Sequence, residues 1–369
     1  MRFLTQEIGS IAKPNWLVKK QRGKKLTEDD WSELNYWMEF GQIKDWQELK
    51  ELLAKETLSD EDKMRLVRWA SILVIRCLEK VGLDIIYDGE QHRSEMYQEP
   101  ISYIEGFEFL GTVRSFDNKY YLKAAAVGCP RLKRYYHLDE FNFIKSQTTK
   151  PLKVPITGPY TLMNWSFNEF YQRKWLKRER DKPKAIWEAN RELAMELARQ
   201  IIQPNIESLI RAGARIIQID EPAATTKPKE IGIFVDAFNQ ATAEIKECKF
   251  TLHICFSNYA LLYPEILNLK NCSQYTFEFA NKGGSYEFLK LMKKNRDERE
   301  VGLGVIDVHT DDLETPEIVL ERIKEAVKII EPERIYINPD CGLRTRSWRV
   351  AFAKLSNMVK GAELARKRL

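Results

Sequence analysis

The stretch that decides the fold is IIQIDEPA, residues 216–223, in which apolar residues run almost unbroken until the chain turns polar at Asp220-Glu221-Pro222. Such a run is typical of a strand buried on both faces, as in a parallel sheet that helices cover on both sides. Helical spacing of apolar residues precedes the stretch over 185–212 and follows it over 231–247. The stretch therefore predicts one parallel strand between two helices.

The same alternation extends over nearly the whole chain and predicts eight strands. We expect them at residues 3–10, 84–90, 152–158, 215–220, 250–255, 274–278, 300–308 and 334–338, with further helices at 61–81, 316–330 and 347–365. Eight strand–helix units are typical of a (β/α)8, or TIM, barrel, a fold that routinely exceeds the usual domain size. We therefore expect residues 1–369 to form a single α/β barrel domain.

Two insertions are predicted in this barrel. The segment between the first two strands is long and rich in tryptophan (Trp31, Trp37, Trp46), and we expect extra helices there. After the second strand, residues 97–127 contain FLGTV and KYYLKAAAV on either side of a Ser-Phe-Asp-Asn turn, a pattern that predicts a β-hairpin.

Composition excludes several classes of protein. The chain has 59 basic and 54 acidic residues, and a net charge of +5 is too small to indicate nucleic-acid binding. It has no apolar run long enough for a membrane span, and its N-terminus lacks the apolar core of a signal peptide. The six cysteines lack the paired spacing of a disulfide framework. We expect a cytoplasmic protein with no nucleic-acid or membrane partner.

Polar residues follow every predicted strand at its carboxyl end. They are Gly9-Ser10, Asp88-Gly89-Glu90, Thr157-Gly158-Pro159, Asp220-Glu221-Pro222, His253-Ile254-Cys255, Glu278, Asp307-Val308-His309 and Asn338-Pro339-Asp340-Cys341-Gly342. In a (β/α)8 barrel the loops at these ends converge on the active site. This end is called the barrel mouth below, and its side chains are candidates for catalysis and binding.

Four of these residues are of types that bind zinc. His253 and Cys255 are two apart on one strand and share a face, Glu278 ends the next strand, and Cys341 follows the last one. One nitrogen, two sulfurs and one oxygen suit tetrahedral Zn2+. A zinc held by two thiolates is suited to binding a further thiol as its thiolate, which favours alkyl transfer to sulfur over hydrolysis.

Four other residues of the mouth are candidates for binding or proton transfer. Asp220 and Glu90 can bind a substrate ammonium, and the position of Asp-Glu-Pro at a strand end in the mouth favours this over a structural ion pair with an interior Arg or Lys. Asp307 and His309 would share one face of a strand, where the carboxylate can orient the imidazole for proton transfer. We predict Asp307 and His309 as the catalytic pair.

These residues also carry a resemblance to a known family. The segments IGS (8–10), DGEQHRSEM (88–96), GPYTLMNWSF (158–167), IIQIDEPA (216–223), HICFSN (253–258), GVIDVHT (304–310) and NPDCGLRTR (338–346) resemble, in order, the catalytic half of cobalamin-independent methionine synthase. They span nearly the entire chain. The chain begins at its counterpart of the catalytic barrel and so resembles the short form found in archaea and some bacteria.

The resemblance implies an activity and a role for each matching residue. The enzyme would methylate the thiolate of L-homocysteine to form L-methionine, with His253, Cys255, Glu278 and Cys341 as ligands of Zn2+. Homocysteine would be held by Ile8, Gly9, Ser10, Glu90 and Asp220. His309 would be the proton donor, and Trp165 would contact the methyl donor.

The methyl donor is predicted from departures from the family pattern. Lys119-Tyr120 replaces an Arg-Cys pair near the folate, and Thr226 replaces a glutamate that can bond to pterin N–H groups. The loop after Phe167 is rich in aromatics and in basic residues, among them Arg173, Lys174, Lys177 and Arg178. We expect the donor to be a methylcorrinoid, free or on its carrier protein, or a methyl-tetrahydropterin, and methyl-tetrahydrofolate to be a poor one.

Two other functions stay open at this stage. The first is zinc-dependent alkyl transfer to another thiol such as coenzyme M, which would need cations for its sulfonate instead of carboxylates for an ammonium. The second is a basic binding protein with a structural zinc, supported by the charge run at residues 173–178.

Overall fold

Six parallel strands form the main sheet of the protein. The computed structural model describes residues 2–114, 120–281 and 286–369. The strands neighbour one another in chain order as β3 Lys153–Thr157, β4 Ile216–Asp220, β5 Lys249–Ile254, β6 Gln274–Glu278, β7 Glu300–Ile306 and β8 Ile335–Pro339. Each lies within two residues of its predicted bounds, because a nearly continuous apolar run marks a strand that is buried on both faces.

Two further segments close the sheet into a barrel. Isolated parallel bridges join Thr5 to Ile337 of β8, Gln6 to Ile85, and Ile86 to Leu152 beside β3. The hydrogen bonds of the ring therefore pass from β8 through both segments to β3, which gives the (β/α)8 barrel that the sequence predicts.

The predicted strands at 3–10 and 84–90 are nevertheless too long. Only single bridges form there, because the backbone leaves the extended conformation at residues with positive φ, namely Phe3, Gly9, Gly89 and Glu90. Extended strands have negative φ, so each of these positions interrupts the ladder.

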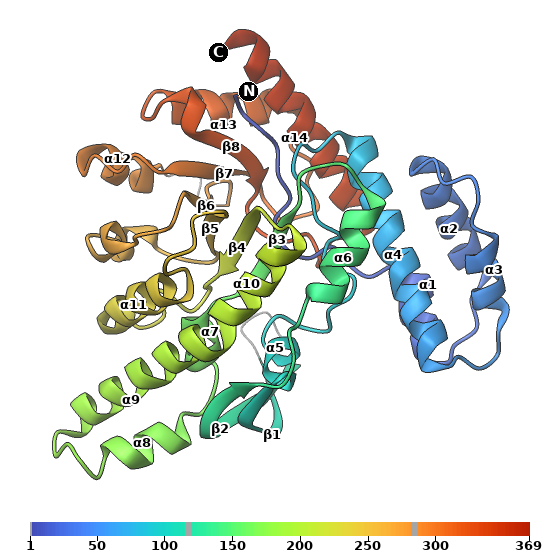
Figure 1. The fold of residues 1–369 in the computed structure, drawn as a ribbon. Helices are drawn as coiled ribbons and strands as arrows, with labels where there is room; N and C mark the ends of the chain where they lie inside the picture. The colour runs from blue at the N-terminus through green and yellow to red at the C-terminus, as the bar shows by residue number, and fades with distance from the viewer. Residues whose placement is uncertain (1, 115–119, 282–285) are drawn as a thin grey trace.

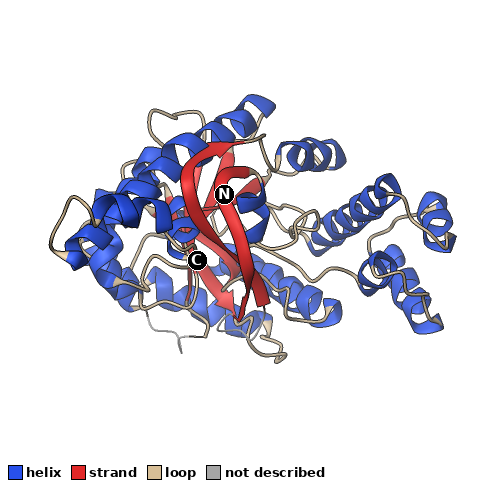
Figure 2. Cartoon of the chain, turned by 90° about the horizontal axis from the view of Figure 1, so that it is seen from below, coloured by secondary structure: helices blue, strands red, loops and turns tan. Residues whose placement is uncertain are grey.

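Helices surround the strands on all sides (Figure 2). They are α4 Asp60–Val81, α6 Leu138–Gln147, α7 Pro159–Asn164, α9 Lys182–Leu197, α10 Gln203–Ala212, α11 Ile231–Ala241, α12 Glu287–Lys294, α13 Pro316–Val327 and α14 Trp348–Arg368, with 3-10 turns at Tyr259–Leu262 and Glu265–Asn268 after β5. Helix α4 begins with a reciprocal capping box between Ser59 and Asp62 and ends at Gly82, whose φ of 95° suits glycine.

Two predicted helices differ from the observed ones. The helix expected over 185–212 contains a π-helical turn, η1 Ala198–Ile202, between α9 and α10. Pro204, in the first turn of α10, has no N–H with which to continue the α-helical ladder. The helix expected over 231–247 ends at Ala241, where the Thr242 hydroxyl donates to the carbonyl of Phe238 and competes with the helical pattern.

Both predicted insertions are present. Helices α1 Asn15–Gln21, α2 Glu28–Phe40 and α3 Gln47–Ala54 lie between the first strand segment and α4. After the second segment come α5 Gln98–Ser102 and an antiparallel hairpin of β1 Ile104–Arg114 and β2 Tyr120–Leu132; the Ser-Phe-Asp-Asn turn falls outside the described residues. Figure 1 shows the hairpin, α5 and α8 Glu169–Trp175 together at one end of the molecule.

The interior of the barrel is partly polar. Gln6, reached from the first segment, donates through its amide to Gln274 at 3.0 Å and to Asn338 at 3.1 Å, and all three side chains are buried. Apolar side chains fill the space between sheet and helices. None of the described helices is both long and apolar enough to cross a membrane.

Candidate functional site

Three of the four predicted zinc ligands lie together at the barrel mouth. His253 is near the end of β5, Cys255 directly follows that strand, and Cys341 follows β8. One ligand atom from each of the three lies within 4.8 Å of the other two. The structure thus brings together residues that are 86 positions apart in the chain, and a single ion can contact all three.

The orientation of His253 fits a metal ligand. Its Nδ1 lies 2.8 Å from the backbone carbonyl of Thr276, and since a carbonyl only accepts, Nδ1 carries the proton. In the neutral imidazole, the form that binds a metal, Nε2 then carries the lone pair, and it is buried without a hydrogen-bond partner among the described residues. An unpaired buried nitrogen is costly unless something binds it. A backbone carbonyl that fixes the tautomer in this way is usual for ligating histidines.

The two thiols interact closely. The hydrogen bond from Cys255, together with His253, holds the pKa of Cys341 well below its usual range, whereas Cys341 raises the pKa of Cys255. Burial lowers the pKa of His253, but the Cys341 charge outweighs burial and brings it to about 9. One thiolate therefore forms readily in this cluster, and thiolates are the form that binds metals.

Glu278, the fourth predicted ligand, lies beside the cluster but outside the group of three. Its Oε2 accepts a 3.0 Å hydrogen bond from Asn281, and its Oε1 is buried without a hydrogen-bond partner among the described residues, 3.9 Å from Nε2 of His309. Asp340 accepts hydrogen bonds from the backbone N–H groups of residues 279–281. Asp340 therefore holds the loop that orients Glu278, a role that the sequence did not reveal.

Asp220 and Glu90 are carboxyls of the mouth with little exposure to solvent, on strand segments that flank β3. Burial raises the pKa of Asp220 to about 6 and that of Glu90 to about 7. Asp220 accepts a 2.8 Å hydrogen bond from Gln218, and Glu90 lies 3.6 Å from Arg93. A cationic group between the two carboxyls would favour their charged forms, so the pair suits an ammonium.

The segment of Ile8, Gly9 and Ser10 packs against the loop that carries Cys341. Ile8 is buried, and Gly9 adopts a φ of 56°. A Cβ on Gly342 would lie 2.7 Å from the backbone nitrogen of Ser10, so only glycine allows this approach. The predicted homocysteine segment and the predicted metal loop are therefore neighbours.

Asp307 and His309 do not lie on a strand, contrary to the prediction. Strand β7 ends at Ile306, and the Asp307 carboxylate accepts a 2.8 Å hydrogen bond from the backbone N–H of His309. The chain leaves the ladder because the Asp307 N–H donates to Glu314 at 2.8 Å. The exposed imidazole of His309 lies 4.6 Å from the Phe256 ring. Asp307 thus shapes the loop, and His309 lies beside Glu278, next to the group of His253, Cys255 and Cys341.

Trp165 lies at the junction of the barrel and the hairpin. It follows α7, and its ring centroid is 6.1 Å from that of Tyr97 and 5.8 Å from that of Tyr121 in β2. Backbone hydrogen bonds of Phe167 with Ala124 and Ala126 fasten the hairpin to this loop. The three rings form an aromatic wall beside the mouth.

A buried ionic network that the sequence did not reveal lies on the side of the mouth that carries Glu90. The Arg93 guanidinium donates to Glu140 at 2.7 Å and to the carbonyl of Pro155 at 2.8 Å, and His137 lies 3.4 Å from Glu140. The three-residue spacing of Glu90 and Arg93 could have predicted the contact between them, because it places both side chains on one side of a turn. Glu140 is distant in the sequence, so its contact with Arg93 could not be predicted.

The contact of Glu221 with α7 was also not predicted from the sequence. It adjoins Asp220, but its carboxylate points to α7 and accepts from the backbone N–H groups of Tyr160 at 3.0 Å and Thr161 at 2.7 Å. A Cβ on Gly158 would clash with this carboxylate. The sequence could have distinguished the two acids, because the side chains of consecutive strand residues point to opposite faces of the sheet.

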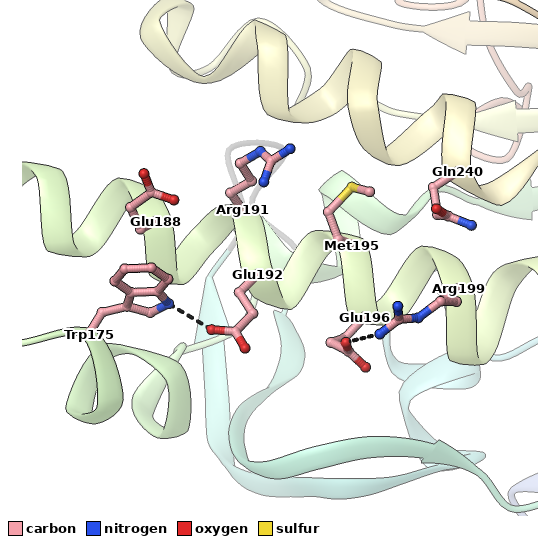
Figure 3. Close-up of a pocket in the computed structure, with 8 residues that line it drawn as sticks. All are labelled: Trp175, Glu188, Arg191, Glu192, Met195, Glu196, Arg199 and Gln240. Atoms are coloured by element: carbon pink, nitrogen blue, oxygen red, sulfur yellow. Dashed lines mark hydrogen bonds and ion pairs between the residues drawn. The ribbon is translucent and has the colours of Figure 1, made fainter. Parts of the chain in front are cut away.

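A surface pocket of about 250 Å³ lies away from these residues, between α8, α9 and α11 (Figure 3). Most of its charged side chains already have partners: Arg199 pairs with Glu196, Arg191 with Asp236, and Glu192 with Lys174 and the Trp175 indole. Because these groups are already satisfied, we assign the chemistry to the mouth instead.

Comparison with known proteins shows the family of the chain. The family described as “Cobalamin-independent synthase, Catalytic domain” matches residues 39–364. A methionine synthase of Thermococcus kodakarensis is 40% identical over 366 residues, which cover 99% of this chain and 94% of the relative. A methionine synthase of Pyrococcus furiosus is 37% identical over 367 residues, with 99% and 93% covered.

A solved structure has the same fold. A B12-independent methionine synthase from a Shewanella species, solved in complex with selenomethionine, superposes with a TM-score of 0.78 at 24% identity, covering 100% of this chain and 98% of its own. At that identity the likeness supports the barrel architecture and not the roles of individual side chains.

Proposed function

Since the chain belongs to the cobalamin-independent methionine synthase family, we propose that it is a zinc-dependent enzyme that methylates the thiolate of L-homocysteine to form L-methionine. Homocysteine methylation is the activity of methionine synthases, and the chain is a methyltransferase of that kind. The zinc, the roles of individual residues and the methyl donor are inferred from the mouth of the barrel.

The observation that carries the proposal is the cluster of His253, Cys255 and Cys341, with an unpaired buried Nε2 on the histidine. These three residues would hold zinc, with Glu278 as the fourth ligand and the one displaced by substrate. Zinc bound there would act as a Lewis acid that keeps the substrate thiol as a nucleophilic thiolate.

The remaining residues of the mouth bind and orient homocysteine. Asp220 and Glu90 receive its ammonium group, and the segment Ile8-Gly9-Ser10 receives the amino-acid backbone beside Gly342. The position of this segment against the metal loop supports the assignment, because the thiol and the amino group of homocysteine are only a few bonds apart. The two carboxylates disfavour a sulfonate thiol such as coenzyme M, since like charges repel.

Methyl transfer requires one bond to form and one to break. The electron pair of the homocysteine thiolate forms the new S–C bond, and the pair of the broken bond stays with the donor. His309 supplies the proton that a departing pterin nitrogen needs, and its exposed ring is accessible to a donor that enters the mouth.

The donor we propose is a methylcorrinoid, free or on a carrier protein, or a methyl-tetrahydropterin, bound against Trp165. The hydroxyl of Thr226 already donates to the carbonyl of Ala223 at 2.8 Å, and threonine has no carboxylate for pterin N–H groups. This supports weaker pterin recognition. The Lys119 position of the family's Arg-Cys pair lies outside the described residues.

We further propose that residues 1–369 act as one barrel domain in the cytoplasm. All six cysteines are free, and the proposed chemistry needs Cys255 and Cys341 as thiolates. A reducing compartment keeps them so.

X-ray absorption spectroscopy at the zinc edge tests the proposal most directly. The zinc-loaded protein should show two sulfur ligands, and saturation with homocysteine should raise the count to three. A count that stays at two would overturn the proposed binding of the substrate thiolate to zinc. A structural zinc would give that result, because a closed site keeps its ligands.

A further inference from the structure

Asp220 has an unusual partner for a buried carboxylate. Among the described residues, the side chain that hydrogen-bonds to it is Gln218, whose Nε2 donates to Oδ1 at 2.8 Å. Both residues belong to β4 and are two apart, so both side chains point into the barrel. The bond is buried, since Gln218 is 0% and Asp220 8% exposed.

Gln218 lies in a polar region of the barrel interior beneath Asp220. Its own Oε1 has no partner among the described residues, and the same holds for Nζ of Lys153 on β3 and Oγ1 of Thr251 on β5. Thr251 is the register partner of Gln218 on the neighbouring strand. Buried polar groups that are only partly satisfied cost stability, so packing alone does not explain a glutamine here.

The chemistry of an amide suits a carboxylate that must bind an ammonium. An arginine or lysine at this position would fix the carboxylate but would also neutralise its charge. A glutamine N–H fixes one oxygen and leaves the negative charge available to an incoming cation. Glu90 instead lies 3.6 Å from the Arg93 guanidinium.

We propose that Gln218 is a positioning residue that orients the Asp220 carboxylate toward the substrate ammonium and so makes the site select thiols that carry an amino group. The inference rests on the proposed function and adds the residue on which its amino-acid specificity depends. Gln218 does not touch the reacting sulfur, so it should influence binding of the amino group and not the metal.

Isothermal titration calorimetry on the zinc-loaded protein can test this with two ligands. One is L-homocysteine, and the other is 4-mercaptobutanoate, which has the same thiol and carboxylate but no amino group. In Gln218→Met, the dissociation constant for homocysteine should rise roughly 10-fold, as expected for one lost bond to a charged group. The constant for 4-mercaptobutanoate and the zinc content should stay unchanged.

Gln274→Met is the matched control. Gln274 is a buried glutamine of the same barrel interior, but its partners are Gln6 and Glu300 instead of Asp220. This variant should bind both ligands like the wild type. If Gln218→Met does not fold, Gln218→Asn keeps the amide but shortens its reach, and it should show the same selective loss.

The outcomes separate this inference from the proposed function. Equal weakening of both ligands, no weakening, or the same selective loss in Gln274→Met would overturn the role of Gln218. If the wild type already binds both thiols equally, the ammonium site itself is wrong and the proposed function fails with it. If Asp220→Asn loses discrimination and both Gln218 variants keep it, only the role of Gln218 is wrong.

Discussion

At the scale of single residues, the chemistry of the mouth depends on how Cys341 and Cys255 share their protons. Cys341 sits after β8 and Cys255 after β5, and the hydrogen bond between them lowers the pKa of Cys341. His253 adds a positive charge when it is protonated. A metal ion that enters this cluster replaces protons by a stronger positive charge, so both sulfurs should bind it as thiolates.

Replacing either thiol by a hydroxyl should therefore abolish zinc binding. Serine keeps the shape of Cys255 or Cys341 but is not deprotonated by zinc at neutral pH, so the loss should exceed the roughly 10–100-fold typical of lost outer-shell contacts. Zinc content by atomic absorption and methionine formation should both fall to background. The exposed Cys129 is the control, and Cys129→Ser should keep both. Stoichiometric zinc in Cys341→Ser would show that another residue completes the site.

The second prediction at this scale concerns His309 and depends on the donor. A departing pterin nitrogen is basic and needs a proton, whereas a departing Co(I) corrinoid is a weak base and needs none. His309→Gln should lower kcat with a methyl-tetrahydropterin by about 100-fold, the lower range for general acid catalysis. With a methylcorrinoid, kcat should change little. Equal loss with both donors would show that His309 acts on homocysteine binding or on Glu278 instead.

The sequence predicted the metal-binding residue types better than their contacts. His253, Cys255 and Cys341 could be selected because few residue types bind zinc and because strand ends converge in a barrel. Asp307 was assigned to the imidazole of His309, but it binds the backbone N–H of that residue, since the strand ends at Ile306, two residues before its predicted end. Contacts of this kind depend on where the ladder stops, and spacing alone does not determine that.

At the scale of elements, short carboxylate contacts fix the loops of the mouth. Glu221 satisfies the first N–H groups of α7, which precedes Trp165, and Asp340 satisfies three N–H groups after β6. A helix N-terminus and a turn each leave such donors unpaired. Each carboxylate therefore connects one loop of the mouth to a neighbouring strand end.

Glu221→Gln should destabilise the protein although it changes only one atom of the side chain. The three groups that face this carboxylate, the N–H of Tyr160 and the N–H and hydroxyl of Thr161, all donate to it. A glutamine would turn its own NH2 toward one of them, leaving a donor unpaired at a cost of about 1–3 kcal/mol. Urea denaturation of the metal-free protein would measure the loss. An unchanged midpoint would mean that the carboxylate is not needed as an acceptor.

The elements themselves were predictable where the chain is regular. Strands β3 to β8 show nearly continuous apolar runs, and the hairpin β1–β2 shows two β-rich runs around polar residues. The first two strands were predicted too long, because the polar residues at their ends are also compatible with an extended backbone. Residue type alone does not show that the backbone adopts positive φ at Gly9 and Glu90. The π-helical turn before Pro204 likewise could not be predicted from residue type and is seen only in the observed backbone.

At the scale of the whole molecule, the hairpin and α8 form a surface beside the mouth. It consists of Lys123, Val127, Phe167, Phe170 and Lys177, and Figure 1 shows the elements that carry it at one end of the molecule. Phe167 is 46% exposed, and its ring lies 4.2 Å from Nζ of Lys123. Arg173 and Lys174 are already paired, with Glu169 and Glu192. Lys177 and Arg178 are exposed, so their charge is available to an anionic partner.

The donor preference follows from this surface and from Thr226. Thr226 offers a pterin no carboxylate, whereas a methylcorrinoid presents a broad ring to Trp165 and a phosphodiester to the basic side chains. At matched concentrations, methionine should form faster from a methylcorrinoid than from methyl-tetrahydrofolate. Faster turnover with methyl-tetrahydrofolate would show that Lys119-Tyr120 and Thr226 were misinterpreted.

The last prediction separates donor binding from homocysteine binding. The double variant Lys177→Glu, Arg178→Glu reverses two charges just after α8, on a segment that carries neither Asp220 nor a proposed zinc ligand. Charge complementarity chiefly affects encounter, so KM for an anionic donor should rise on the order of 10-fold at low salt and less at high salt, where screening shortens the range of the field. KM for homocysteine should stay unchanged. Lys367→Glu, Arg368→Glu makes the same change on the exposed end of α14, which lies at the opposite end of the molecule in Figure 1, and should alter neither value. The donor does not use this surface if its KM is unchanged in Lys177→Glu, Arg178→Glu, or if its KM rises equally in Lys367→Glu, Arg368→Glu.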